Sequence, residues 1–290
     1  MSMPCIRVLI FRRVFRVVII ICGLLFPAVA RSSAQDRPPE PEEQRQAKQL
    51  LNEGVQAFKN GQYEDAKREF SRAKQPDPHL LNARLCLPTT YASQYFPGAP
   101  SEETVRQGQK AITEFKYVVE IDPQNLSATD GLSSMLFQTG GQPFDPDLFA
   151  ESNSYPQKHT QLRPQDPDPY YWIGVIDRTL AFRANGQIRA RFNLLVWGKQ
   201  LSKGAPLPPE LRDEYDREYG VTIEEGVKFL EKALVPRPDY DDAVAYLNLL
   251  YRRKADQAYN DEERADWTKR ADDLIDKIKE IKQKMAETPN

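Results

Sequence analysis

The amino-acid sequence predicts an all-α fold, a solenoid of helix-turn-helix repeats closed by a C-terminal capping helix. From residue 47 onward, apolar side chains recur every three or four positions, which is the period of an amphipathic helix. The stretch "GVQAFKNGQYEDAKREFSRAKQPDP", residues 54–78, places two such helices on either side of a short Asn-Gly turn, and related stretches return further along the chain. A hairpin of this size cannot bury its apolar face alone, so the repeats must stack on one another.

Composition and charge exclude several classes of protein. The 290 residues are 40% hydrophobic and 28% charged, which excludes a wholly disordered chain and a polytopic membrane protein. After residue 34, 35 basic and 42 acidic residues give a formal charge of −7, which argues against nucleic-acid binding because phosphates require a clustered basic surface. Cys86 is the single cysteine in this part of the sequence, so a disulfide framework and a cysteine-based metal site are excluded.

The N-terminal segment has the pattern of a targeting sequence. Within residues 1–34, four arginines precede the apolar run "VVIIICGLLFPAV", and small residues that end at Ala30 or Ala34 offer a cleavage site. We therefore expect a signal peptide and an exported protein, periplasmic or secreted. The alternative is an uncleaved segment that anchors the chain in the membrane, although this run is shorter than the roughly 20 apolar residues that span a bilayer. Residues 35–46 form a Pro/charge-rich linker.

The first helical hairpin is expected over residues 47–60 and 63–75. Gly61 can adopt the left-handed backbone that ends a helix, and Pro78 prevents continuation of the second helix. Small residues would let the two backbones approach, while aromatic rings fill the space between this hairpin and the next. The small residues are Gly54, Ala66 and Ala73, and the aromatic residues are Tyr63 and Phe70.

Residues 47–80 resemble the tetratricopeptide repeat family, whose pattern of about 34 residues has Gly in the first helix, Ala-x3-Phe in the second and a closing Pro. Three later stretches are similar in part: "AITEFKYVVEIDPQN", "LRPQDPDPYYWIGVI" and "GVKFLEKALVPRPDYDDAVAYLNLLY". The first and last matches carry these positions: Gly54, Ala66, Phe70, Ala73 and Pro78; Gly226, Leu230, Ala233, Pro238, Val244, Leu247 and Tyr251. The resemblance implies an array of helical hairpins over residues 47–285.

The repeats are irregular. An insertion at about residues 183–222 has helical periodicity and is expected to lengthen the two helices of one hairpin. Pro88 predicts a kink or a late start in a first helix, and Pro156 weakens the prediction of a second helix near it. A charged terminal helix at about 260–285 would cap the array, and residues 286–290 form a tail.

Motifs for catalysis, cofactors and metals are absent from the sequence. It contains neither a phosphate-binding loop nor a dinucleotide fingerprint nor a nucleophile elbow, and its two histidines, His79 and His159, cannot form an H-E-x-x-H zinc motif. Both histidines are expected at the surface. We therefore predict no catalytic residues, no cofactor and no metal, and the protein is not expected to be an enzyme.

The resemblance implies a concave groove lined by the first helix of each repeat, where a protein or peptide partner binds. By register, nine side chains are expected to face it: Phe58, Lys59, Phe137, Gln138, Tyr171, Val175, Arg178, Arg252 and Arg253. Because Arg pairs with carboxylates in a bidentate manner, the partner is expected to present acidic groups or a C-terminal carboxylate. The alternative is that Tyr171 and Arg178 only cover a neighbouring helix.

These observations predict a non-catalytic protein-protein interaction scaffold of the cell envelope. The alternative is a ligand-binding or enzyme-accessory protein that uses a pocket between the groove and the insertion, which would need converging arginines in an apolar hollow. Self-association through Trp197 or the terminal helix is a further expectation.

Overall fold

The computed structural model describes residues 42–75, 77, 80–98, 101–141, 143–196, 200–202 and 205–287. These ranges contain helices and no strand, and the all-α helical-repeat fold predicted from the sequence is confirmed. The expectations for the signal peptide, the linker up to residue 41, Pro78, His79 and Trp197 concern residues outside the described ranges. Among the described helices, none has the length and apolar character needed to cross a membrane.

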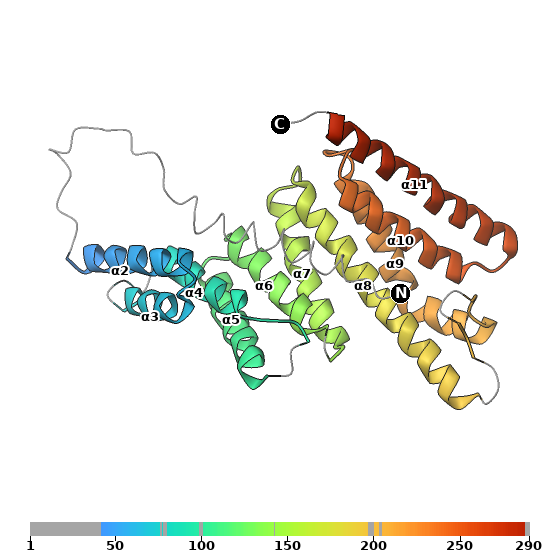
Figure 1. The fold of residues 1–290 in the computed structure, drawn as a ribbon. Coiled ribbons are helices and arrows are strands. Elements are labelled where there is room, and N and C mark those ends of the chain that lie inside the picture. The colour runs from blue at the N-terminus through green and yellow to red at the C-terminus, as the bar shows by residue number, and fades with distance from the viewer. Residues whose placement is uncertain are drawn as a thin grey trace. The chain divides into compact units, whose positions relative to one another are not determined.

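The chain forms two compact units, which divide between Pro143 and Phe144. In the first unit each helix packs on the next, and α4 also contacts α2 and α6, so the first helices of successive hairpins lie side by side. Figure 1 shows the short α2–α3 hairpin at the start of this unit. The helices are α2 (Glu42–Lys59), α3 (Tyr63–Ala73), α4 (Leu81–Ser93), α5 (Glu102–Ile121) and α6 (Leu126–Thr139).

The first hairpin is the one that the sequence predicts, except that α2 already begins at Glu42, within the residues expected to form the end of the linker. Helices α2 and α3 are joined at Gly61, whose φ of 74° lies in the left-handed region. The Phe70 ring of α3 lies so close to Gly54 of α2 that a Cβ atom there would be 2.6 Å from the ring. Phe70 is fully buried, and it shares one apolar cluster with Cys86 and Leu87 of α4. The hairpin therefore completes its core only by packing on the next helix.

Helix α4 differs from the expectation for Pro88. The predicted late start is wrong, because the helix begins at Leu81 and runs through the proline. Pro88 cannot donate the backbone hydrogen bond that a helix would make to the carbonyl of Arg84. The hydroxyls of the next two residues, Thr89 and Thr90, donate to the carbonyls of Leu85 and Cys86 at 2.8 and 2.7 Å and are thereby satisfied within the helix. These four residues are buried with Pro88, so tertiary packing stabilises a helix that local propensity disfavours.

The second unit contains two unusually long helices. Helices α8 and α9 have 29 and 25 residues, and both extend into the 183–222 region. Successive helices pack on one another, α10 also contacts α8, and α11 lies along α10 (Figure 1). The helices are α7 (Pro146–Leu162), α8 (Pro167–Leu195), α9 (Pro209–Ala233), α10 (Asp241–Gln257) and α11 (Asp261–Glu287).

Helix α7 is continuous despite the weak sequence signal around Pro156. Asp145 caps its first turn by accepting from the backbone N–H groups of Asp147 and Leu148 at 3.0 and 3.2 Å. The helix buries a narrow stripe that includes Phe149, Ser152, Pro156 and His159. The expectation that His159 lies at the surface is wrong. It is 5% exposed, and its ring lies 3.5 Å from the carboxylate of Asp166.

A buried carboxyl group joins α7, α8 and α9. Asp177 of α8 is 2% exposed and accepts a hydrogen bond from Nδ2 of Asn153 at 2.6 Å. Its pKa is well above the ordinary value, mainly because burial penalises the charged form and also because Glu225 adds a like charge. Oδ2 of Asp177 and Oδ1 of Asn153 have no hydrogen-bond partner among the described residues. A proton on Asp177 would therefore add a donor beside these two unpartnered oxygens.

Two glycines of α8 should respond in opposite directions to substitution by alanine. A Cβ atom at Gly174 would lie 2.3 Å from Cγ of the buried Leu230, whereas nothing lies within 4 Å of one at Gly186. Gly174→Ala should reduce the free energy of unfolding by about 1–3 kcal/mol through overpacking. Gly186→Ala should increase it by about 0.4–1 kcal/mol, because alanine favours the helix. Urea denaturation followed by circular dichroism measures both, and equal effects at the two positions would contradict this account of the α8–α9 contact.

Stability should also depend on the proton of Asp177. Since its pKa is higher in the folded state, folding takes up a proton, and this contribution is present below the unfolded pKa and lost as pH rises through the folded pKa. Asp177→Asn supplies an N–H donor at every pH, so its free energy of unfolding should decline less between acidic and neutral pH than that of the wild type. The exposed Asp273→Asn is the control. Parallel profiles for wild type and Asp177→Asn in denaturant titrations would show that Asp177 is ionised in the folded protein.

Candidate functional site

The candidate site lies where α8 and α10 pack together in the second unit. Arg178 and Phe182, one helical turn apart on α8, and Arg253 of α10 converge there. The guanidinium carbon of Arg178 is 4.6 Å from the centroid of the Phe182 ring, and that of Arg253 is 6.0 Å from the same centroid. The ring remains 46% exposed. We call these three residues the arginine-aromatic site.

The two arginines of this site differ in how their charges are balanced. Arg253 forms an ion pair with Asp256 at 2.7 Å. Arg178 has no ion pair or hydrogen bond within the described residues, although its side chain is partly buried. The pKa of Arg178 is lowered, mainly by desolvation and further by the like charge of Arg253. A guanidinium remains protonated in proteins, so the site holds a positive charge that lacks a carboxylate partner.

Burial also shifts the pKa of Asp256, the carboxyl group that pairs with Arg253. The pKa of Asp256 is raised because burial disfavours its carboxylate, an effect that the positive charges of Arg253, Arg189 and Arg264 oppose. Arg189 is nearly buried and donates to Asn185 at 2.7 Å and to the carbonyl of Ser202 at 3.0 Å. Three positive charges, those of Arg253, Arg189 and Arg264, therefore act on the single carboxylate of Asp256.

An aromatic cluster holds α8 and α10 in place beside the site. The Tyr171 ring lies 4.9 Å from the Tyr240 ring and 5.7 Å from the Tyr246 ring. Burial raises the pKa of Tyr246 to about 12, although the charge of Arg178 opposes the shift. Because these rings fix the spacing of the two helices, they help to place Arg178 of α8 and Arg253 of α10 near Phe182.

The structure separates the nine residues predicted for the groove into buried and accessible positions. Phe58, Tyr171 and Val175 are buried, which gives each of them a packing role in its unit. Phe58 packs with Val55 and Phe70, and its ring lies 5.6 Å from that of Tyr63. Lys59 is exposed at the end of α2. A role for these residues in partner binding stays a prediction.

The remaining predicted residues lie in both units. In the first unit, Phe137 is partly buried, and Gln138 donates to Ser134 at 3.0 Å while its backbone carbonyl accepts from Tyr95. In the second unit, Arg252 pairs with Asp272 of α11 at 2.8 Å. Of the predicted pair Arg252 and Arg253, only Arg253 is therefore directed to the arginine-aromatic site.

Sequence reasoning missed Phe182, the one large apolar side chain of the site. A signal was present, since Phe182 follows Arg178 by four residues and both therefore lie on one face of α8. The tetratricopeptide pattern did not indicate it, because α8 is longer than the first helix of a regular repeat. Only the length of α8 in the structure shows that this face continues beyond Arg178.

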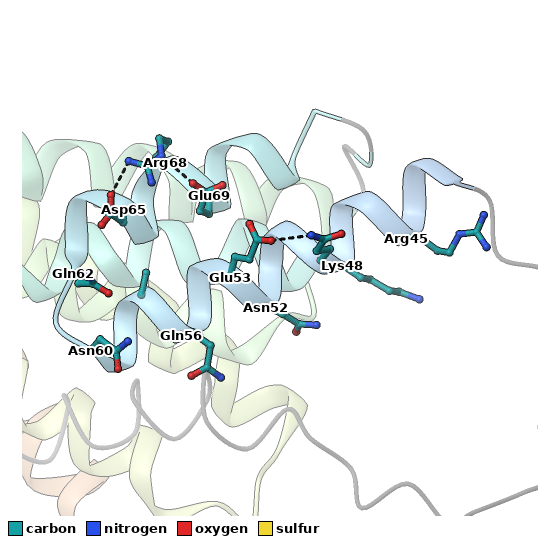
Figure 2. A pocket seen from close by; sticks show the side chains of 12 residues that line it. Arg45, Lys48, Asn52, Glu53, Gln56, Asn60, Gln62, Asp65, Arg68 and Glu69 are labelled. Atoms are coloured by element: carbon teal, nitrogen blue, oxygen red, sulfur yellow. Dashed lines mark hydrogen bonds and ion pairs between the residues drawn. The ribbon is translucent and has the colours of Figure 1, made fainter.

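A groove also lies along the first hairpin. It has a volume of about 740 Å³ and is lined by polar side chains of α2 and α3, among them Asn52, Gln56 and Asn60 (Figure 2). A second hollow of about 520 Å³ lies along α9. Across the described ranges, no cluster of His, Cys, Asp and Glu side chains could hold a metal ion.

Comparison with solved structures identifies the fold. The chain is similar to a crystal structure of MamA at 15% sequence identity and a TM-score of 0.55, over 85% of this chain and 97% of that one. MamA from Desulfovibrio magneticus RS-1 gives 15% identity and a TM-score of 0.53, over 82% of this chain and 96% of that one. At such low identity, the likeness shows a shared helical-repeat fold and nothing further.

No protein-family model matches the sequence. No curated protein matches it either.

Proposed function

We propose that the protein is a non-catalytic scaffold that binds a carboxylate-bearing segment of another protein at the arginine-aromatic site. The observation that supports this most directly is Arg178, a partly buried guanidinium without a carboxylate partner in the described chain. Burial removes part of the water that would solvate this guanidinium, and a partner carboxylate would replace that water with an ion pair and hydrogen bonds. Hydrogen bonds to charged groups contribute about 1.5–3 kcal/mol.

The exposed Phe182 ring gives the same site an apolar anchor. Aromatic and arginine side chains dominate the binding energy of protein interfaces, because they combine large contact areas with directional hydrogen bonds. Cation–π contact with Arg178 also restricts the ring before a partner arrives, which lowers the entropy lost on binding. We therefore propose a partner segment in which an acidic residue lies near an apolar one.

We also propose that the scaffold acts outside the cytoplasm, in the periplasm or as a secreted protein. This is supported by the basic and apolar N-terminal sequence, with its small residues before Gln35. Mass spectrometry of the protein purified from its native host should give a mature chain that begins near Arg31 or Gln35. An intact N terminus in the membrane fraction would support the anchored alternative, and an intact chain in the cytosol would contradict export.

The binding proposal predicts specific losses of affinity. The probe is a short fluorescein-labelled peptide of alternating Glu and Leu, measured by fluorescence polarisation. Arg178→Gln and Phe182→Ala should each weaken binding about tenfold or more, which corresponds to about 1.4 kcal/mol. Affinity for the wild type should fall as salt is added, because the interaction is electrostatic.

Two controls make this result interpretable. Arg183→Gln removes a charge from the same helix outside the site and should retain wild-type affinity. The peptide with Gln in place of Glu should bind the wild type as weakly as the acidic peptide binds Arg178→Gln. Unchanged binding of the acidic peptide by a folded Arg178→Gln variant would overturn the proposed site.

A further inference from the structure

Another arginine of α8, outside the arginine-aromatic site, is buried without a counter-ion. Arg189 is 6% exposed, and its side chain donates to two uncharged acceptors, the side-chain oxygen of Asn185 and the backbone carbonyl of Ser202. It forms no ion pair within the described residues. Burial of a charge is unfavourable unless an opposite charge compensates for the hydration that is lost. The described chain provides no such compensation for Arg189.

The groups around Arg189 do not supply the missing negative charge. Asp256 of α10 is the carboxylate whose charge acts on Arg189, but its ion pair is with Arg253, at 2.7 Å. Arg264 of α11 adds a positive charge, and it also lacks an ion pair within the part of the chain that the structure describes. Residues 196–208, between α8 and α9, contain two lysines and neither Asp nor Glu. A counter-ion for Arg189 would therefore come from solution.

Two buried N–H groups at this position lack an acceptor. Nη2 of Arg189 and Nδ2 of Asn185 are buried and have no hydrogen-bond partner among the described residues. Chemistry fixes the orientation of the Asn185 amide: Nε of Arg189 can only donate, so the atom 2.7 Å from it is Oδ1, and the other is the NH₂ group. Because the guanidinium and the amide are in contact, their unpartnered nitrogens lie close together. One small anion can therefore accept from both.

We propose that Arg189 and Asn185 form a binding site for a small inorganic anion, with chloride and inorganic phosphate as the candidate ligands. The anion accepts from Nη2 of Arg189 and Nδ2 of Asn185, and it supplies the negative charge that the described chain lacks there. Hydrogen bonds to an ion are about twice as strong as those between neutral groups. The competing account is a buried water molecule, which satisfies the two donors but leaves the charge of Arg189 uncompensated.

The test measures how stability depends on the anion. Urea denaturation is followed by circular dichroism while chloride, or phosphate in a second series, replaces gluconate at constant ionic strength. An ion that binds only the folded protein raises its stability with the logarithm of the ion concentration above the Kd. The urea midpoint of the wild type should rise in this way with the anion that the site prefers, which distinguishes the two candidates. The same midpoint in all three salts would overturn the proposal.

Three variants separate binding at the site from general effects of salt, which act on every variant. Asn185→Asp supplies a counter-ion within the chain, because its two oxygens can accept from Nε and Nη2 of Arg189. Arg189→Met removes the charge. Both variants should therefore lose the anion dependence of the wild type. Arg191→Gln replaces an exposed arginine of the same helix, which pairs with Glu214, and it should keep that dependence.

Crystallography locates the ion directly. In crystals grown with bromide or phosphate, an anomalous bromine peak or tetrahedral density should lie within hydrogen-bond distance of Nη2 of Arg189 and Nδ2 of Asn185. Three results would overturn the proposal: a water molecule at that position, an ion there without anion-dependent stability, which would be an adventitious ion only, or full anion dependence in Asn185→Asp. Arg178→Gln should keep the anion dependence, so failure here and failure at the arginine-aromatic site are distinguishable.

Discussion

The structure depends on close approach between the two helices of the α2–α3 hairpin and of the α8–α9 hairpin. In the α2–α3 hairpin, the Phe70 ring covers Gly54, and in the α8–α9 hairpin the Leu230 side chain covers Gly174 at distances that leave no room for a Cβ atom. These contacts bring one face of each hairpin together as a single apolar surface. That surface is too large for one hairpin to bury, so it packs on the next first helix. The same packing places α8 beside α10, and it is this neighbourhood that forms the arginine-aromatic site.

Buried polar groups modify this apolar framework in the second unit. Asp177, Asn185 and Arg189 are buried, and Asn153, which donates to Asp177, is partly buried. Apolar residues at these positions would suffice if packing were their only role. Burying such groups is favourable only where hydrogen bonds or proton uptake compensate for lost hydration. Their directional contacts fix α7, α8 and the segment after α8 relative to one another, which supports the surface that includes Arg178. Binding by a rigid surface loses less entropy than binding by a mobile one.

The helical hairpins could be predicted from the sequence because they depend on contacts between residues that are close together in the chain. The packing of the first hairpin can be predicted from the spacing of Gly54, Ala66 and Phe70 in the sequence. The sequence was insufficient at Pro88, where the helix continues although local propensity disfavours it, and at His159, which is buried. Tyr171 shows the same limit, since register places it on α8 but only the aromatic rings of Tyr240 and Tyr246 show that it is buried. Arg178 and Arg253 were anticipated as groove residues, whereas the convergence of both on Phe182 depends on tertiary structure.

The central claim is that the surface around Phe182 binds a carboxylate-bearing segment of another protein. The most direct measurement is site-specific photocrosslinking in the native host, with a benzophenone amino acid at position 182 and, as a control, at the exposed Val221 of α9. Mass spectrometry then maps the crosslinked peptide. The account predicts that position 182 captures an acidic segment of one partner and that position 221 does not. Adducts at position 182 without acidic residues, or the same adducts at both positions, would contradict it.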